Sequence, residues 1–284
     1  ADRESGGITQ HIGASVAEFQ GKKITFIDTP GHEAFSQMRR RGAKIADIAV
    51  LVVAAEEGCK PQTKEAAAAI KKAGLPVIVA MNKTDLPQAN VEKVKRDLEK
   101  EGLLVEDWGG NVPAIEKKKK TGQGINELLE MILLVAEMEN LQADSDAAAA
   151  GIVIESSLDH RRGPSAAILL QKGSLSAGKV IATASALGKI KFLEDSRGNK
   201  IDKLLPSQPA VAIGLDAVPV TGEVFQEFES LDAARKFVIG RQKEIKSAAA
   251  TAETVELQEG QKNLNLILKA DVLGSLEVLK ETLL

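Results

Sequence analysis

Apolar and polar positions alternate in blocks over the first half of the chain. Three apolar blocks are rich in β-branched residues, at residues 22–27 (KKITFI), 48–53 (IAVLVV) and 76–81 (PVIVAM). Continuous apolarity over such short lengths predicts strands covered on both faces, as in a parallel sheet. Apolar residues at helical spacing follow at residues 61–73, 91–101 and 125–139. The alternation predicts a doubly wound, mostly parallel α/β sheet, with functional loops at the carboxyl ends of its strands.

The pattern changes after Asp144. From residue 151 to about residue 228 the apolar segments are short, and glycine or proline separates them. The clearest segments are residues 151–157, 165–171, 179–183 and 189–193. Many short strands at this spacing predict a small antiparallel β-barrel.

The last part of the chain has a third character. Residues 231–252 are charged and rich in alanine, which predicts a helix, and residues 263–269 (NLNLILK) and 275–284 predict a strand followed by a helix. These last residues are too few to enclose a core, so we expect them to begin a further α/β domain. The expected limits are residues 1–143 for the first α/β domain, 144–229 for the barrel, 230–262 for a helical linker and 263–284 for the start of the last domain.

Composition narrows the class of protein. The 284 residues are 44 % hydrophobic and 27 % charged, with a formal net charge of −3. This balance is typical of soluble globular proteins and lacks the strong basic excess of a simple nucleic-acid clamp. The single cysteine, Cys59, excludes an internal disulfide framework. The most apolar run, residues 48–55, is far shorter than the roughly 20 residues of a membrane span, so we expect an intracellular protein without a membrane segment.

The first candidate for chemistry is Asp28-Thr29-Pro30-Gly31, directly after the apolar block 22–27. A carboxylate at the end of a strand can reach Mg²⁺, often through water, because this ion keeps much of its hydration shell. A glycine shortly afterwards lets a backbone N–H approach a phosphate with no side chain in the way. The alternative is a plain turn in which Asp28 or Thr29 caps a helix.

The second candidate is Asn82-Lys83-Thr84-Asp85, after the apolar block 76–81. A carboxylate that accepts from both the ring N–H and the exocyclic amine of guanine discriminates against adenine by a factor of about 10⁴. Asn82 can support the loop and contact the base edge, and the stem of Lys83 can cover its face. Alone, these four residues also fit an ordinary polar turn. Together with the upstream motif, they predict a guanine-nucleotide-binding domain.

Several segments in order carry a family resemblance: GGITQHIG (6–13), DTPGHEAF (28–35), MRRRGAKIADIAVLVVAAEEG (38–58), NKTD (82–85) and LEMILLVAEMENL (129–141). They closely resemble the bacterial-type translation initiation factor two family of the translational GTPase superfamily. Segments 151–164 and 264–277 extend the resemblance over nearly the whole chain. Elongation factors share the DTPGH and NKxD motifs but carry a different segment in place of GGITQ. The implied fold is a P-loop-type GTPase domain, then the barrel, the linker and the start of an α/β domain.

The resemblance implies a role for each matched residue. Thr9 would give its hydroxyl to Mg²⁺, and Asp28 would hold the metal through water. Gly31 would sense the γ-phosphate of GTP, and His32 would position the attacking water. Guanine would be read by Asn82, Lys83 and Asp85.

Two segments depart from the family pattern. The phosphate loop G-x-x-x-x-G-K-[ST] occurs nowhere in the chain. We expect it upstream of Ala1, and we expect the chain alone to bind GTP poorly. In EKKKKTG (116–122), Lys118, Lys119 and Lys120 stand where the family has Ser-Ala-Lys. The backbone of Lys119 can still contact the guanine oxygen and Lys120 matches the family lysine, but a solvated charge run is the alternative.

Two basic clusters have open interpretations. Arg39, Arg40 and Arg41 fall on the helix expected after DTPGH, where they face ribosomal RNA or form a solvated helix end. His160-Arg161-Arg162 lies in a barrel loop, which is near the ribosome or simply exposed.

The resemblance implies a function for the intact protein. It would deliver formylmethionyl initiator tRNA to the small ribosomal subunit, promote subunit joining, and hydrolyse GTP to GDP and phosphate when the large subunit triggers it. Initiator tRNA would bind a domain absent here. We expect a monomer in the bacterial cytoplasm, with an organellar matrix or stroma as the alternative. Two other functions stay open: another translational GTPase, such as an elongation or selenocysteine factor, and a ribosome-binding scaffold that binds no nucleotide.

Overall fold

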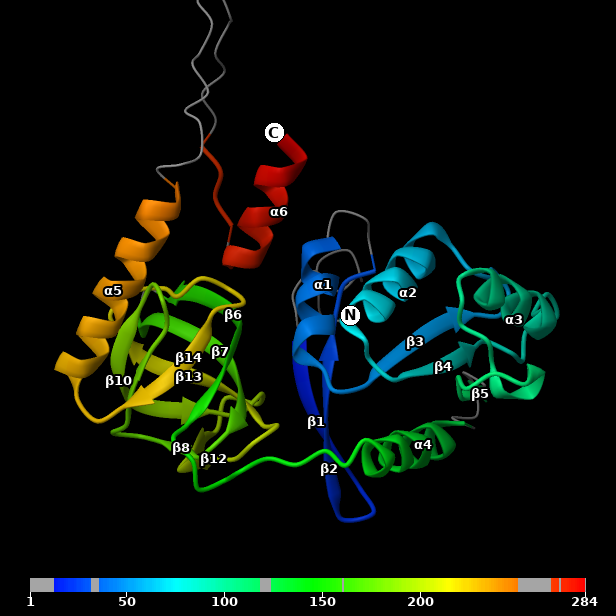
Figure 1. Ribbon diagram of the computed structural model, residues 1–284, viewed down its shortest axis with the longest axis horizontal. Coiled ribbons are helices and arrows are strands. Elements are labelled where there is room, and N and C mark those ends of the chain that lie inside the picture. Colours follow the sequence, from blue (N-terminus) through cyan, green and yellow to red (C-terminus); the bar gives the residue numbers. More distant parts are fainter. Residues whose placement is uncertain are drawn as a thin grey trace, which may run out of the picture. The chain divides into compact units, whose positions relative to one another are not determined.

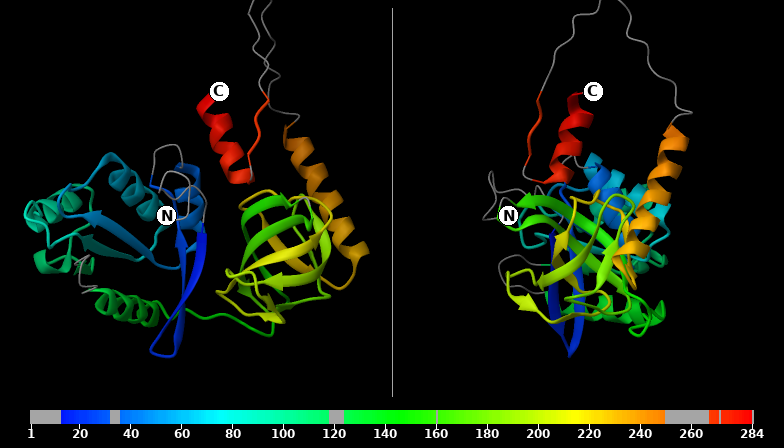
Figure 2. Two further views of the ribbon diagram at one scale, coloured as in Figure 1. Left: turned by 180° about the vertical axis from the view of Figure 1, so that it is seen from behind. Right: turned by 90° about the vertical axis from the view of Figure 1, so that its left-hand side faces the viewer.

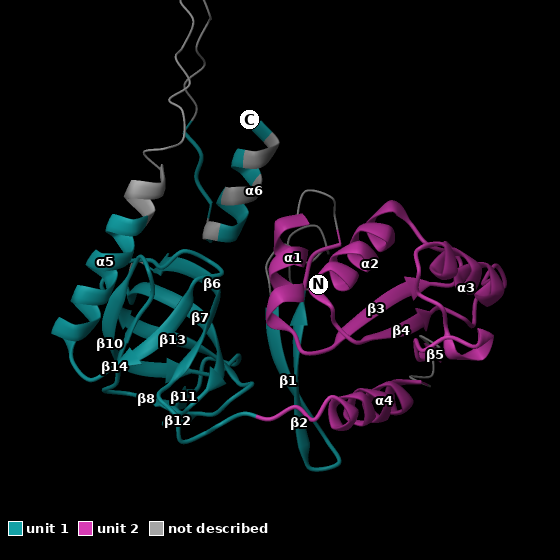
Figure 3. Ribbon diagram, in the orientation of Figure 1, with its two compact units in different colours: residues 1–28, 143–284 teal, residues 29–142 magenta. Residues whose placement is uncertain are grey.

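The computed structural model describes residues 13–31, 36–117, 124–159, 161–249, 267–270 and 272–283. Its contacts divide the chain into two compact units, which Figure 3 shows in different colours. One unit is residues 29–142, and the other is residues 1–28 with residues 143–284.

The unit of residues 29–142 is built on a sheet of three parallel strands. In spatial order they are β3 (Ala49–Ala54), β4 (Val77–Asn82) and β5 (Ala114–Glu116), as Figure 1 shows. The central strand has four consecutive side chains, Ile78 to Met81, that are at most 2 % exposed. Such a run needs cover on both faces of the sheet. The predicted parallel α/β architecture is confirmed, and the apolar blocks 48–53 and 76–81 supply two of its strands. The prediction that the block 22–27 is a parallel strand covered on both faces is wrong, because this block pairs antiparallel with residues 13–19 in a separate two-stranded sheet.

Four helices belong to this unit: α1 (Ser36–Ile45), α2 (Pro61–Ala73), α3 (Val91–Lys100) and α4 (Ile125–Met138). The limits of α2 follow from its sequence. Pro61 has the φ angle that a first helical residue needs, and Gly74 ends the helix in the left-handed region at φ 69°. At the start of α3, the Asn90 side chain accepts a hydrogen bond from the Lys93 N–H at 2.9 Å.

The core of the unit lies between the sheet and two of these helices. Ala67 and Ile70 of α2, with Val94 and Leu98 of α3, pack on buried side chains of β3 and β4. Val94 and Leu98 are fully buried and lie one helical turn apart, as the sequence pattern of residues 91–101 predicts.

The other unit begins with a β-hairpin. The strands β1 (Gly13–Phe19) and β2 (Lys22–Asp28) pair antiparallel, with Phe19 opposite Lys22. Gln20 and Gly21 form the two-residue turn, both at positive φ (52° and 74°), which suits the twist of a hairpin. The sequence analysis did not predict β1.

The barrel follows as a closed antiparallel sheet. Its strands run in the order β11-β10-β13-β7-β6-β14-β9, and β9 pairs again with β10 to close the ring. Their limits are β6 (Ala150–Asp159), β7 (Gly163–Lys172), β9 (Val180–Ala182), β10 (Leu187–Glu194), β11 (Lys200–Ile201), β13 (Pro209–Leu215) and β14 (Val224–Phe228). A separate short pair joins β8 (Leu175–Ser176) to β12 (Lys203–Leu204). The predicted antiparallel barrel is confirmed.

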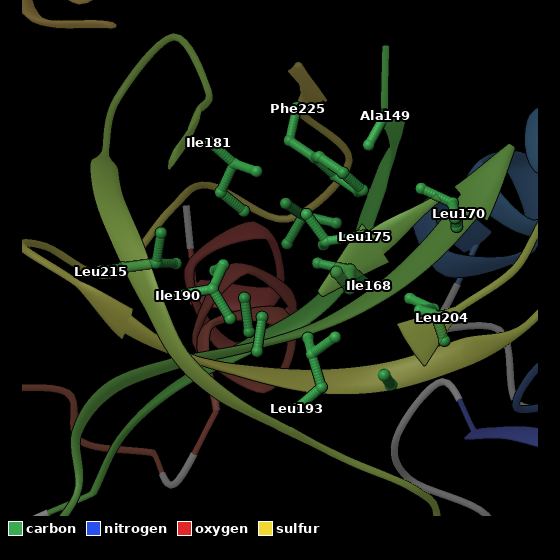
Figure 4. Packing of buried hydrophobic residues seen from close by; sticks show 14 residues of the cluster. Ala149, Ile168, Leu170, Leu175, Ile181, Ile190, Leu193, Leu204, Leu215 and Phe225 are labelled. Carbon is green, nitrogen blue, oxygen red and sulfur yellow. The ribbon is translucent and has the colours of Figure 1, made fainter. Parts of the chain in front are cut away.

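Inward-facing side chains fill the barrel, as Figure 4 shows. Phe225 is the largest of the fully buried side chains. Its ring lies against Gly151, where an added Cβ would come within 2.8 Å of the ring and 2.1 Å of the Leu169 carbonyl oxygen. Only glycine therefore fits at position 151 in this packing.

Two further helices belong to this unit, α5 (Leu231–Ala249) and α6 (Leu273–Leu283). Ala234 and Val238 of α5 pack on Val180 and Leu187 of the barrel, and Figure 2 shows this helix along the barrel side. The predicted strand 263–269 is wrong for its described part. Residues 267–270 form no strand and pair with none of the described strands, and the Ile267 side chain is 88 % exposed. Residues 263–266 lie outside the described residues.

Replacing Phe225 with alanine is expected to destabilise the barrel by about 3 to 5 kcal/mol, because it leaves a cavity that the surrounding strands cannot fill. Native-state hydrogen exchange of the β6 and β14 amides measures this loss. The neighbouring Val224 is 51 % exposed on the same strand, so Val224→Ala is the matched control, with an expected effect within about 0.5 kcal/mol. Equal loss of protection in the two variants would contradict this account of the core.

Candidate functional site

The loop after β4 carries three of the predicted base-reading residues, and the backbone fixes its course. Asn82 turns its side chain back, so that its Oδ1 atom accepts from the Lys83 N–H at 2.9 Å. Lys83 adopts the left-handed region at φ 59°, which is uncommon for a residue with a side chain. The Asn82 carbonyl accepts from the Ala55 N–H at 2.8 Å, which ties this turn to the end of β3.

A carboxylate from the loop after β3 holds the Lys83 side chain. The Lys83 ammonium forms an ion pair with Glu56, whose side chain is only 15 % exposed. Gln88, which lies after Lys83 in the loop that follows β4, donates from Nε2 to the second carboxylate oxygen of Glu56 at 3.3 Å. The hydrogen bond to Glu56 raises the pKa of Lys83 above its usual value, against the opposing effect of partial desolvation. Glu56 therefore supports the loop at two points.

The end of β5 braces the same loop from the other side. The Lys117 N–H donates to the Met81 carbonyl at 2.7 Å, and the Lys117 carbonyl accepts from the Thr84 N–H at 3.4 Å and the Thr84 hydroxyl at 3.3 Å. Gly124, at φ 89°, then returns the chain so close to Glu116 that an added Cβ would lie 2.3 Å from the Glu116 carbonyl oxygen. The predicted base contacts Lys118, Lys119 and Lys120 lie outside the described residues.

Asp85 stands at the exposed end of this braced loop. Within the described part of the chain its carboxylate makes no hydrogen bond or ion pair, so both oxygens are available to a ligand. A ligand that offers two adjacent N–H donors would satisfy them together. The structure therefore brings Asn82, Lys83 and Asp85 into one loop, and their contacts with a base stay a prediction.

The DTPG motif crosses the boundary between the two compact units. Asp28 is the last residue of β2, opposite Gly13, and it is exposed, while Thr29 to Gly31 belong to the other unit. The carboxylate of Asp28 supplies the oxygen chemistry that Mg²⁺ prefers. Thr9 and His32 lie outside the described residues. Among the described side chains, no group of three or more His, Cys, Asp or Glu could hold a metal ion.

The arginine cluster on α1 differs from its sequence interpretation. Arg40 is exposed, but Arg39 is 8 % exposed and points into the unit. Its NH1 donates to the Pro30 carbonyl at 2.9 Å, and its NH2 lies 2.6 Å from the Glu65 carboxylate. The interpretation of Arg39 as facing RNA or solvent is wrong, because it packs on the DTPG loop. The sequence did indicate this burial, because Met38, Gly42 and Ile45 share one face of the helix and Arg39 lies on the same face.

The basic barrel loop is ordered by its own backbone. The Asp159 carboxylate accepts from the N–H groups of Arg161 and Arg162 at 2.7 and 2.9 Å, which lowers the pKa of Asp159. The Arg162 guanidinium pairs with Glu194 at 2.6 Å. His160 lies outside the described residues. These contacts fit an exposed hairpin loop and name no partner.

Two family models match the chain in succession. The Elongation factor Tu GTP binding domain matches residues 1–138, and Elongation factor G domain 2 matches residues 148–228. Among the described helices, none combines the length and the apolarity of a membrane span.

Similar proteins cover almost the whole chain. Translation initiation factor IF-2 of Chloroflexus aurantiacus is 47 % identical over 98 % of the chain, and that of Solibacter usitatus is 48 % identical over 100 % of it. The chain spans 39 % and 29 % of the length of these two proteins. The crystal structure of GDP-bound aIF5B from Aeropyrum pernix matches with a TM-score of 0.67 and 26 % identity, covering 99 % of this chain and 57 % of that one. The elongation factor SelB of Methanococcus maripaludis, at 21 % identity over 78 % of this chain and 50 % of its own, has a TM-score of 0.62 and shares the fold.

Replacing Glu56 with glutamine is expected to lower the pKa of Lys83 towards the ordinary lysine value, because the hydrogen bond to the Glu56 carboxylate is the largest cause of the raised pKa. A lysine with a raised pKa stabilises the folded state below its ordinary pKa, and this contribution disappears as the pH rises through the folded-state value. The ion pair therefore supports the loop at neutral pH and is lost in strong alkali. NMR titration of the Lys83 ammonium measures the change. Glu57 acts on Lys83 by charge alone, so Glu57→Gln is the control, and an equal decrease there would contradict the assignment.

Proposed function

We propose that this chain, which belongs to the translation initiation factor IF-2 family, forms the GTP-binding and GTP-hydrolysing core of an initiation factor. The observation that carries the proposal is the braced loop after β4, which leaves the Asp85 carboxylate exposed for a base. The relative from Aeropyrum pernix, whose structure is GDP-bound, supports binding of a guanine nucleotide.

Guanine selection would rest on Asp85. Its two oxygens would accept from the ring N–H and the exocyclic amine of guanine, whereas adenine would leave the carboxylate without these donors. Asn82, bonded to the Lys83 N–H, keeps the loop in shape, and the Lys83 stem would cover one face of the base. The backbone of Lys119 would contact the guanine oxygen, and Lys118 and Lys120 would complete this part of the base site.

The phosphate side of the site would use the residues of the DTPGH and GGITQ motifs. Thr9 and Asp28 would hold Mg²⁺, which offsets the charge of the phosphates. The Gly31 N–H would donate to the γ-phosphate, and its lack of a side chain permits the approach. His32 would position a water for in-line attack, so that the bond between the β,γ-bridging oxygen and the γ-phosphorus breaks and GDP and phosphate leave.

The partners and limits of the factor are part of the same proposal. The intact protein would act on the small and large ribosomal subunits and deliver initiator tRNA through a domain outside this chain, as a monomer in the cytoplasm. Domain limits at residues 1–143, 144–229, 230–262 and 263–284 complete the proposal. The two family matches support the first two limits.

Asp85→Asn in the full-length protein is expected to weaken GTP binding by about 100-fold or more and to favour xanthosine triphosphate. Xanthine has a carbonyl oxygen where guanine has its exocyclic amine, and the asparagine amide can donate to that oxygen. Competition between the two nucleotides for a fluorescent GTP analogue measures the change. Asp47→Asn, at an exposed aspartate before β3, is the control and should leave the preference for guanine intact. Unchanged selectivity in Asp85→Asn would remove Asp85 from the base site.

His32→Ala is expected to slow ribosome-triggered GTP hydrolysis by about 100-fold or more while leaving GTP affinity unchanged, because the histidine acts on the water rather than on the bound nucleotide. Single-turnover hydrolysis with ribosomes, next to equilibrium binding, separates the two effects. A wild-type rate in this variant would show that another group positions the water.

A further inference from the structure

The buried face of α1 lies on the DTPG loop. Met38, Arg39, Gly42 and Ile45 make up this face, at the spacing of neighbouring helical turns. Gly42 packs so closely on the loop that an added Cβ would lie 2.8 Å from the Thr29 Cγ2 atom. Arg39, one turn earlier, reaches the next loop residue, Pro30. The helix thus contacts two successive residues of the loop, immediately before Gly31.

Arg39 joins the loop to a second helix. Its side chain is 7 % exposed and bridges the Pro30 carbonyl oxygen, at 2.9 Å, and the carboxylate of Glu65 on α2, at 2.6 Å. Burying a guanidinium costs free energy unless hydrogen bonds and an opposite charge compensate it. An apolar pair of similar size often stabilises a fold just as much as a buried ion pair. What an apolar pair cannot do is hold the Pro30 carbonyl in one orientation, as the guanidinium does through its hydrogen bond.

The orientation of that carbonyl decides where the next N–H points. The Pro30 carbonyl and the Gly31 N–H belong to the same peptide group. This group is planar and trans, so its C=O and its N–H point in opposite directions. A hydrogen bond that holds the Pro30 oxygen towards α1 therefore directs the Gly31 N–H away from α1.

We propose that Arg39, held by Glu65, is a positioning residue that aims the Gly31 N–H at the terminal phosphate of GTP. The inference rests on the proposed function, in which Gly31 contacts that phosphate. Arg39 itself touches no nucleotide in this arrangement. Its effect is therefore specific to the triphosphate, because GDP lacks the group that the Gly31 N–H would contact.

The test compares two nucleotides in the full-length protein. Arg39→Gln and Glu65→Gln are each expected to weaken binding of a non-hydrolysable GTP analogue by about tenfold, the effect of one misdirected hydrogen bond to a charged group. The affinity for GDP should change by no more than about twofold. Equilibrium titration with fluorescent forms of both nucleotides gives the ratio of the two dissociation constants, which a merely structural role would leave unchanged.

Matched variants make the outcome decisive. Arg40 is the exposed neighbour on α1, and Arg40→Gln should keep the wild-type ratio. The double variant Arg39→Gln/Glu65→Gln should weaken the analogue no more than either single change, because both act through one contact. If Arg39→Gln fails to fold, Glu65→Gln carries the test, since that side chain is 35 % exposed.

The titrations distinguish a failure of the role of Arg39 from a failure of the proposed function. Equal weakening of both nucleotides, or no weakening of either, would overturn the role of Arg39 while leaving guanine-nucleotide binding in place. Wild-type protein that binds neither nucleotide would instead overturn the proposed function, and the role of Arg39 with it.

Discussion

Parallel pairing on both sides of β4 is the constraint on which the unit of residues 29–142 depends. The pairing places the carboxyl ends of β3, β4 and β5 at one edge of the sheet. Because Ile78 to Met81 are buried on both faces, polar side chains first become possible at Asn82. The loops that leave the three strands then lie side by side, and their backbone groups satisfy one another through Ala55, Asn82, Thr84 and Lys117.

This mutual bonding accounts for the unusual backbone of the loop after β4. A left-handed residue such as Lys83 costs free energy unless its surroundings hold it. Here the Asn82 side chain bonds the Lys83 N–H, and Glu56 holds the ammonium. A loop that is already in its binding shape loses little conformational freedom when a ligand arrives. In the proposed function, order in this loop would therefore favour affinity for the base as well as selectivity.

Sequence patterns predicted the elements whose signal is local. The limits of α2 follow from Pro61 and Gly74, and the three apolar blocks correspond to β2, β3 and β4, although β2 pairs antiparallel with β1 instead of joining the parallel sheet. The sequence pattern did not indicate β1, because none of its side chains is buried and its pattern therefore lacks a core-facing run. Nor did it indicate β5, which has only three residues. The described part of the strand expected at 263–269 pairs with no described strand. A strand needs a partner that is distant in the sequence, and a local pattern of residues does not indicate whether that partner exists.

The same limit applies to the candidate site. The motifs DTPG and NKTD identified the residues that would face a nucleotide, because those residues follow strands directly. The supporting residues could not be found in this way. Arg39 stands in a run of three arginines, and only the spacing of the apolar residues around that run, on the helix face of Met38, Gly42 and Ile45, separates the buried member from its exposed neighbour. Glu56 stands beside Glu57, and only the fold decides which carboxylate reaches Lys83.

The segment from β3 into α2 supplies a carboxylate to each half of the site. Glu56, just after β3, holds Lys83 in the loop that would read the base, and Glu65, in α2, holds Arg39 against the loop that would meet the phosphates. Immediately before Glu56, the backbone of Ala55 is bonded to both Asn82 and Asn90, so the start of this segment is fixed to the sheet edge. Helices and strands of a close-packed interior move as units rather than bending freely. A displacement of α2 would therefore act on the Arg39–Glu65 ion pair, whereas Glu56 stays with the sheet edge. One continuous segment thus supports both halves of the site, although no residue belongs to both.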